Sequence, residues 1–132
     1  MAQELQEPLP GERLIDGSWI LALMALTKLD SKGGITALAG GTLTSATPVL
    51  VNGLNRISVC ATNADSVTLP PAKAGSMIAV RNAGAADATV FSNGSGDFIN
   101  ATAGSTGVTL AAGLNAIFFC AEDTFWARVL TA

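Results

Sequence analysis

Four carboxylates in this sequence could carry acid–base chemistry, because paired Asp or Glu side chains can donate and accept protons in turn. They are Asp87, Asp97, Glu122 and Asp123. Each stands alone in or beside a predicted turn, with no nucleophile, base or glycine-rich phosphate loop nearby. The chain has no histidine and no tyrosine. We therefore predict solvated turn residues and a protein that is not an enzyme, because a β-sandwich hydrolase would need a catalytic constellation that is missing here.

A metal site is not expected either. Calcium coordination by Asp97 with neighbouring carbonyl oxygens would need an oxygen-rich ligand spacing, which this part of the sequence lacks. A zinc site would need Cys and His ligands in close spacing, and the chain has neither a CxxC pair nor a histidine. We predict no catalytic residue, no cofactor and no metal.

The two cysteines occupy equivalent positions in a phrase that occurs twice. GLNRISVCA (residues 53–61) returns as GLNAIFFCA (residues 113–121), which places Cys60 and Cys120 near the ends of two predicted strands. They could form a disulfide if the copies face each other, or fill core pockets as free thiols. The repeat itself could be a duplication, or two hairpins that converged on one turn solution.

Composition and charge exclude several classes of partner. Charged residues make up 13% of the chain, against about 25% in typical soluble domains. The net charge is −3 and the seven Lys and Arg are scattered singly, so a nucleic-acid partner is not expected. The apolar run over residues 19–26 is shorter than the ~20 residues that cross a bilayer, and the acidic start differs from a secretory signal. We expect no membrane association and synthesis in the cytoplasm.

Three segments are predicted along the chain. Residues 1–17 carry Pro and Gly without a helical or strand period and form an extended arm. Residues 18–34 form a short helix, over about 18–31, with a linker ending in Gly33 and Gly34. Its stripe of Trp19, Leu23 and Leu26 either packs on the β-domain or docks onto another protein.

Residues 35–132 are predicted to form an all-β domain, an antiparallel β-sandwich or barrel of jelly-roll-like type. Runs rich in Val, Ile, Thr and Phe alternate with Gly, Pro, Asn and Asp every eight to twelve residues. Strands are expected near 35–38, 47–51, 54–61, 64–69, 76–82, 87–92, 97–100, 106–111, 114–121 and 124–131. Asn52 and Gly53 are expected to form a hairpin turn, because both positions of a type I′ turn need positive φ. Each copy of the phrase would then be the centre of a three-stranded meander.

Three motifs resemble small virion β-proteins of tailed bacteriophages. They are TLPPAKAGSMIAVRNAG (residues 68–84), GDFIN (residues 96–100) and FWARV (residues 125–129). The resemblance covers about residues 64–131 and extends to capsid decoration (cement) proteins and tail-fibre tip modules, which commonly assemble as trimers.

The resemblance implies a structural role on the particle. We expect a homotrimer that sits on the capsid surface of the virion, assembled in the host cytoplasm, and that bridges subunits of the major capsid protein. The alternative is a tail-fibre or spike tip that binds a host receptor. Residues expected to contact the capsid are the apolar anchors of the arm, Leu5, Leu9, Leu14 and Ile15. Residues expected in trimer or helix packing are Trp19, Leu23, Leu26, Phe118 and Phe119, of which the last two could also be core.

Overall fold

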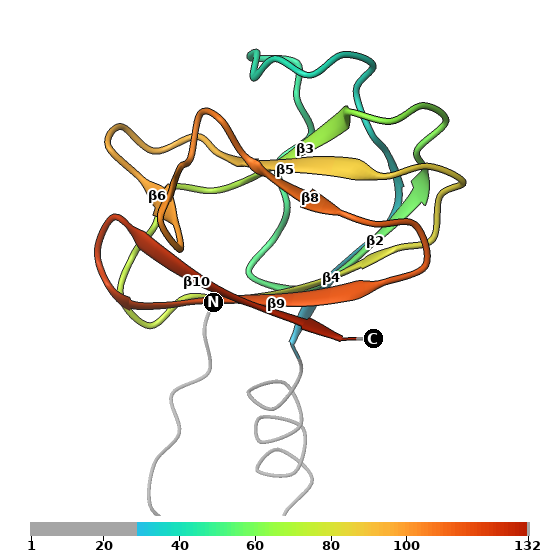
Figure 1. Cartoon of the computed structure of the whole chain (residues 1–132). Helices are drawn as coiled ribbons and strands as arrows, with labels where there is room; N and C mark the ends of the chain where they lie inside the picture. Colours follow the sequence, from blue (N-terminus) through green and yellow to red (C-terminus); the bar gives the residue numbers. More distant parts are fainter. Residues whose placement is uncertain (1–28, 132) are drawn as a thin grey trace, which may run out of the picture.

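The protein forms ten β-strands in two sheets, as the computed structural model describes for residues 29–131 (Figure 1). In chain order the strands are β1 (Asp30–Thr36), β2 (Gly53–Val59), β3 (Asp65–Leu69), β4 (Met77–Asn82), β5 (Ala88–Ser92), β6 (Phe98–Ile99), β7 (Thr102–Ala103), β8 (Val108–Leu110), β9 (Asn115–Glu122) and β10 (Phe125–Thr131). These residues contain no helix. The all-β prediction is therefore confirmed.

Two predicted segments fall largely outside the described residues. The arm over 1–17 and residues 18–28 of the predicted helix are not described. The described end of that predicted helix is not helical, because Asp30 and Ser31 open β1 and pair with Gly53 and Leu54 of β2. The predicted helix is therefore too long at its C-terminal end, because pairing with β2 holds these residues in a strand.

The chain winds alternately through the two sheets. The larger sheet has the order β1-β2-β4-β9-β10-β6-β7, and the smaller has the order β3-β5-β8. β2 pairs with β4 in parallel, with Gly53 opposite Ile78, and β3 pairs with β5 in parallel, with Asp65 opposite Ala88. Figure 1 shows β3, β5 and β8 in the upper layer and β2, β4, β9 and β10 in the lower layer. This winding is that of a short β-solenoid.

The predicted antiparallel sandwich or barrel is therefore wrong in its strand pairing. Parallel neighbours need a crossover connection between them. Here the β2–β4 crossover contains β3 and the β3–β5 crossover contains β4, each a strand of the opposite sheet. From β2 to β5, strands consecutive in sequence therefore lie in different layers. Antiparallel pairs come later in the chain, where β8 pairs with β5, and β9 pairs with both β4 and β10.

The core lies between the two sheets. Buried and more exposed residues alternate along β2, β4 and the first part of β9, because successive side chains of a strand point to opposite faces. The largest fully buried side chains include Trp126, Phe91 and Phe118. Phe118 is thus a core residue, which decides between the two roles that the sequence allowed for it.

The predicted hairpin at Asn52 and Gly53 does not form. β2 instead has a parallel neighbour on each side, β1 and β4. Gly53 (φ 138°) is required for a different reason, because a Cβ at this position would clash with the carbonyl oxygen of Asp30 in β1. Gly113 (φ 81°), its counterpart in the second copy, has open space around it. Of the two predicted meanders, only the β9–β10 pair is antiparallel as expected.

Side chains at the corners connect one circuit of the chain to the next. Asn52 Oδ1 accepts a hydrogen bond from the Met77 amide at 2.9 Å, and Asn63 Oδ1 accepts one from the Asp87 amide at 3.1 Å. Asp87 Oδ1 in turn accepts from the Ala112 amide at 3.0 Å. Backbone amides at a corner have no ladder partner, so these acceptors satisfy donors that would otherwise depend on water. Successive circuits are thereby fixed relative to one another.

Candidate functional site: the outer face of the seven-stranded sheet

Asp97 is a buried carboxylate that holds several segments together. Its Oδ2 accepts hydrogen bonds from the Ala72 amide at 2.8 Å and from Ser92 Oγ at 2.5 Å. Trp126 Nε1 donates to the same Ser92 hydroxyl at 3.2 Å. Gly94 must lack a side chain, because a Cβ there would clash with the Asp97 carboxylate. The prediction of a solvated turn residue is therefore wrong for Asp97, which is buried.

The other candidate carboxylates lie at turns. Asp87 accepts from the Ala112 amide, and Asp123 Oδ1 accepts from the Ala74 amide at 2.9 Å. Glu122 ends β9 and is exposed. Asp97 and Asp123 thus bind amides of the same connection, between β3 and β4, through Ala72 and Ala74. Asp87 binds an amide of the connection between β8 and β9.

Asp65 is a further structural carboxylate that the sequence reasoning missed. Its Oδ1 accepts from Thr62 Oγ1 at 2.5 Å, and its Oδ2 accepts from the amides of Ala61 at 2.9 Å and Thr62 at 3.1 Å. The hydrogen bonds from Thr62, the hydroxyl first and then the amide, lower the pKa of Asp65 although burial opposes the shift. The signal that could have found it is the Thr-x-x-Asp spacing, which suits local side-chain-to-backbone bonding.

Cys60 and Cys120 are buried free thiols. Ile57 lies opposite Asn82, and Phe119 lies opposite Met77, so the two cysteines sit near opposite ends of β4. That separation excludes a disulfide between them within this fold. Burial is the main cause that raises the pKa of both thiols, and the charges of Asp65 and Asp87 raise that of Cys60 further. Over residues 29–131, no group of three His, Cys, Asp or Glu side chains could hold a metal ion.

The outer face of the seven-stranded sheet carries a continuous apolar row. Strand register places Leu54 beside Ala79, Ala79 beside Ile117, and Ile117 beside Val129, across β2, β4, β9 and β10. Leu54 is 50% exposed, Ile117 37% and Val129 51%. These positions alternate with the buried ones, so the side chains point away from the core. We call this set the outer row.

Further apolar side chains extend the outer row toward one end of the sheet. Met77, 60% exposed, lies opposite the half-buried Phe119. Beyond them Phe98 of β6 and Phe125 of β10 stack with ring centroids 5.5 Å apart and planes inclined by 13°. Both rings are partly exposed. Contiguous apolar surface of this kind marks an interaction site more often than a solvated surface.

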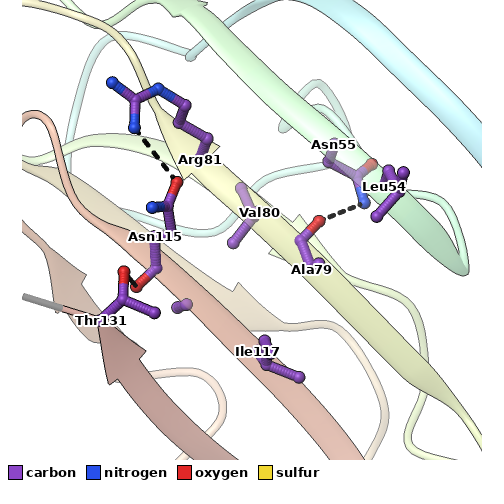
Figure 2. Close-up of a pocket in the computed structure, with 9 residues that line it drawn as sticks. Leu54, Asn55, Ala79, Val80, Arg81, Asn115, Ile117 and Thr131 are labelled. Carbon is purple, nitrogen blue, oxygen red and sulfur yellow. Dashed lines mark hydrogen bonds between the residues drawn. The ribbon is translucent and has the colours of Figure 1, made fainter.

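Two arginines flank the other side of the outer row. Arg56 and Arg81 lie side by side on β2 and β4, and both are exposed. Arg56 donates to Ser58 Oγ at 2.7 Å, and Arg81 donates to Asn115 Oδ1 at 3.3 Å. A shallow depression of about 280 Å³ lies between the outer row and Arg81. Figure 2 shows the side chains that line it, with Leu54, Ala79 and Ile117 among them. This surface can offer apolar contact and guanidinium hydrogen bonds to a partner.

Most of the predicted contact residues lie outside the described part of the chain, namely Leu5, Leu9, Leu14, Ile15, Trp19, Leu23 and Leu26. Of the remaining two, Phe118 is in the core and Phe119 is half-buried on the outer face. Sequence reasoning missed Leu54, Ile117 and Val129. The sequence did contain a signal for this face, because Ile117, Phe118 and Phe119 are consecutive apolar residues. A strand that is apolar at both its inward and its outward positions has two faces that need to be covered.

A scan against protein-family models and searches of curated proteins and of solved structures returned no match to this chain. Residues 29–131 include no helix with the length and apolar character that crossing a bilayer requires. The function must therefore be argued from the surface described above.

Proposed function

We propose that this chain is a structural virion protein, a capsid decoration protein that trimerises on a phage head and bridges major capsid subunits. The observation that carries the proposal is the uncovered outer row on a domain whose buried carboxylates, Asp65 and Asp97, are already occupied by donors of the fold. Within residues 29–131 the molecule has a surface for association and no buried carboxylate left for chemistry, so we propose no enzymatic activity.

The short β-solenoid suits a decoration role because its corners are tied by side chains. A rigid body loses little conformational entropy when it binds, which favours association. A protein that binds only the assembled shell stabilises it by RT ln(1 + [L]/Kd), about 2.7 kcal/mol when its concentration is a hundredfold above Kd. In this proposal Leu5, Leu9, Leu14 and Ile15 of the arm contact the capsid, and trimerisation multiplies their effect through effective concentration.

The alternative is a tail-fibre or spike tip that binds a host receptor. The stacked pair Phe98 and Phe125 favours this second candidate, because partly exposed aromatic rings can pack against the apolar face of a ligand. No shaft or coiled-coil segment accompanies the pair within residues 29–131, which is why the decoration role comes first.

Immuno-electron microscopy of purified virions carrying an epitope-tagged copy of this chain tests the proposal. Label distributed over the heads supports decoration, label confined to tail tips supports the alternative, and particles without label contradict both. A second test deletes residues 1–15. The truncated protein should keep the oligomeric state of the full chain and lose its binding to stripped heads. Normal head coating by the truncated protein would contradict the role of the arm.

A further inference from the structure

We propose that the outer face of β2, β4, β9 and β10 is the surface through which three copies of this chain meet. The inference rests on the proposed function only in assuming a homotrimer, and it adds where the copies touch and how they are oriented.

The first argument is the composition of the face. Leu54, Ile117 and Val129 stand in one row over adjacent strands, and Met77 and Phe119 form the next row. Surface-exposed strands in a sheet with one covered face normally carry polar residues outward. The outward positions of these two rows are instead apolar and partly exposed. The free energy of the molecule therefore falls when another apolar surface covers them. Because the chain carries few charges, the same face of another copy is suited to cover these apolar side chains.

The second argument is the distribution of charge along the strands. Arg56 and Arg81 lie at one end of the face, with neutral oxygens as their hydrogen-bond partners. Glu122 and Asp123 lie at the opposite end, where β9 turns into β10. Arg81 is opposite Asn115, and the seven steps from one residue to the next between Asn115 and Glu122 span roughly 23 Å at 3.3 Å per residue. The arginines and the acidic turn therefore cannot pair within one copy.

The third argument concerns symmetry. In a closed three-fold ring each copy presents one patch to one neighbour and a different patch to the other. If the strands run across the three-fold axis, the arginine end of one copy meets the acidic turn of the next at each corner. If the strands ran along the axis, arginines would meet arginines. Charge complementarity thus selects a trimer whose coils stack parallel to the three-fold axis.

Sedimentation equilibrium of the full chain, with a matched pair of variants, tests the interface. V129E places a carboxylate in the outer row. V59E is the control, because Val59 is also an exposed valine (47%, against 51% for Val129) but it ends β2 in phase with the buried Ile57. We expect the wild type and V59E to be trimers, and V129E to dissociate with at least about a hundredfold weaker association. Circular dichroism should show that both variants keep the β fold.

Charge exchange tests the orientation. R81E and E122R should each weaken the trimer, and the double variant R81E/E122R should regain most of the loss, because the exchanged charges face each other again. A trimer that V129E leaves intact would overturn the interface. A dimer, or a double variant no tighter than the weaker single one, would overturn the three-fold arrangement. Virion labelling is a separate readout, so a trimer with this interface that labels no particle would contradict only the proposed function.

Discussion

Asn52 Oδ1 accepts the backbone amide of Met77, which lies one circuit further along the chain, at 2.9 Å. This bond joins the corner before β2 to the start of β4, and Asn63 makes the equivalent bond to Asp87. The side chains of these asparagines thus join successive circuits at the corners, as backbone hydrogen bonds join neighbouring strands.

The first prediction concerns this corner bond. N52A should lower the free energy of unfolding by about 1 kcal/mol, since it removes one hydrogen bond and leaves the Met77 amide to water. The measurement is urea denaturation at one fixed protein concentration, because an oligomer's stability depends on concentration. The control is N93A, at an exposed position where the backbone amide, bonded to Leu69 O, is retained. Equal losses in both variants would contradict a special role for the corner.

The second prediction compares the two equivalent glycines of the repeated phrase. G53A should destabilise the protein by about 3 kcal/mol or more, because the new Cβ meets backbone of Asp30 and β1 must move. G113A should cost about 1–2 kcal/mol, the strain of a positive φ in open space. Thermal and urea unfolding of both variants measure the difference. If G113A proves as damaging as G53A, the close approach of β1 is not the reason for Gly53.

The third prediction concerns the buried network of Asp97, Ser92 and Trp126. D97A leaves the Ala72 amide and the Ser92 hydroxyl without their acceptor, which should cost about 3 kcal/mol. Because Trp126 donates to Ser92 Oγ, its fluorescence spectrum should also shift. The matched control is D123A, which removes one exposed hydrogen bond, to Ala74, and should cost less than about 1 kcal/mol. A D97A protein as stable as D123A would show that the network contributes little.

The fourth prediction is a pH dependence caused by Asp65. Hydrogen bonds, chiefly from Thr62, lower the pKa of this carboxyl below its ordinary value of 3.8. The unfolded chain therefore binds a proton at a higher pH than the folded chain does, and stability rises with pH in that window. The stabilisation is fully present above the unfolded pKa and is lost as the pH falls below 3.8 toward the folded pKa.

Unfolding free energies of the wild type, D65N and T62V between about pH 2.5 and 7 measure this effect, a range that begins below the ordinary carboxyl pKa and extends well above it. D65N cannot titrate and should have a flatter acid slope, and T62V should lie between the two because it removes only the largest contribution to the shift. An acid slope that D65N leaves unchanged would assign the pH dependence to other carboxylates.

Local sequence signals predicted where most strands lie but not how they pair. Nine of the predicted strands overlap named strands, because alternation and turn residues act over a few neighbours. The predicted strand over 47–51 instead contributes one isolated bridge, between Val49 and Thr68. The Asn52–Gly53 pair predicts a hairpin turn. In the structure Gly53 instead allows the close approach of β1, and Asn52 accepts a hydrogen bond from the first residue of β4.

The sequence by itself determined an all-β domain and the approximate positions of most of its strands. Periodicity, turn chemistry and composition are local properties, so they can be read without knowing which segments meet. Only the tertiary structure decided that β3, β5 and β8 form a second sheet, that Cys60 and Cys120 are free thiols too far apart to bond, and that Leu54, Ile117 and Val129 form one exposed row. Those are relations between residues far apart in the sequence. Parallel pairing of every second strand, β2 with β4 and β3 with β5, produces no signal in the local sequence pattern.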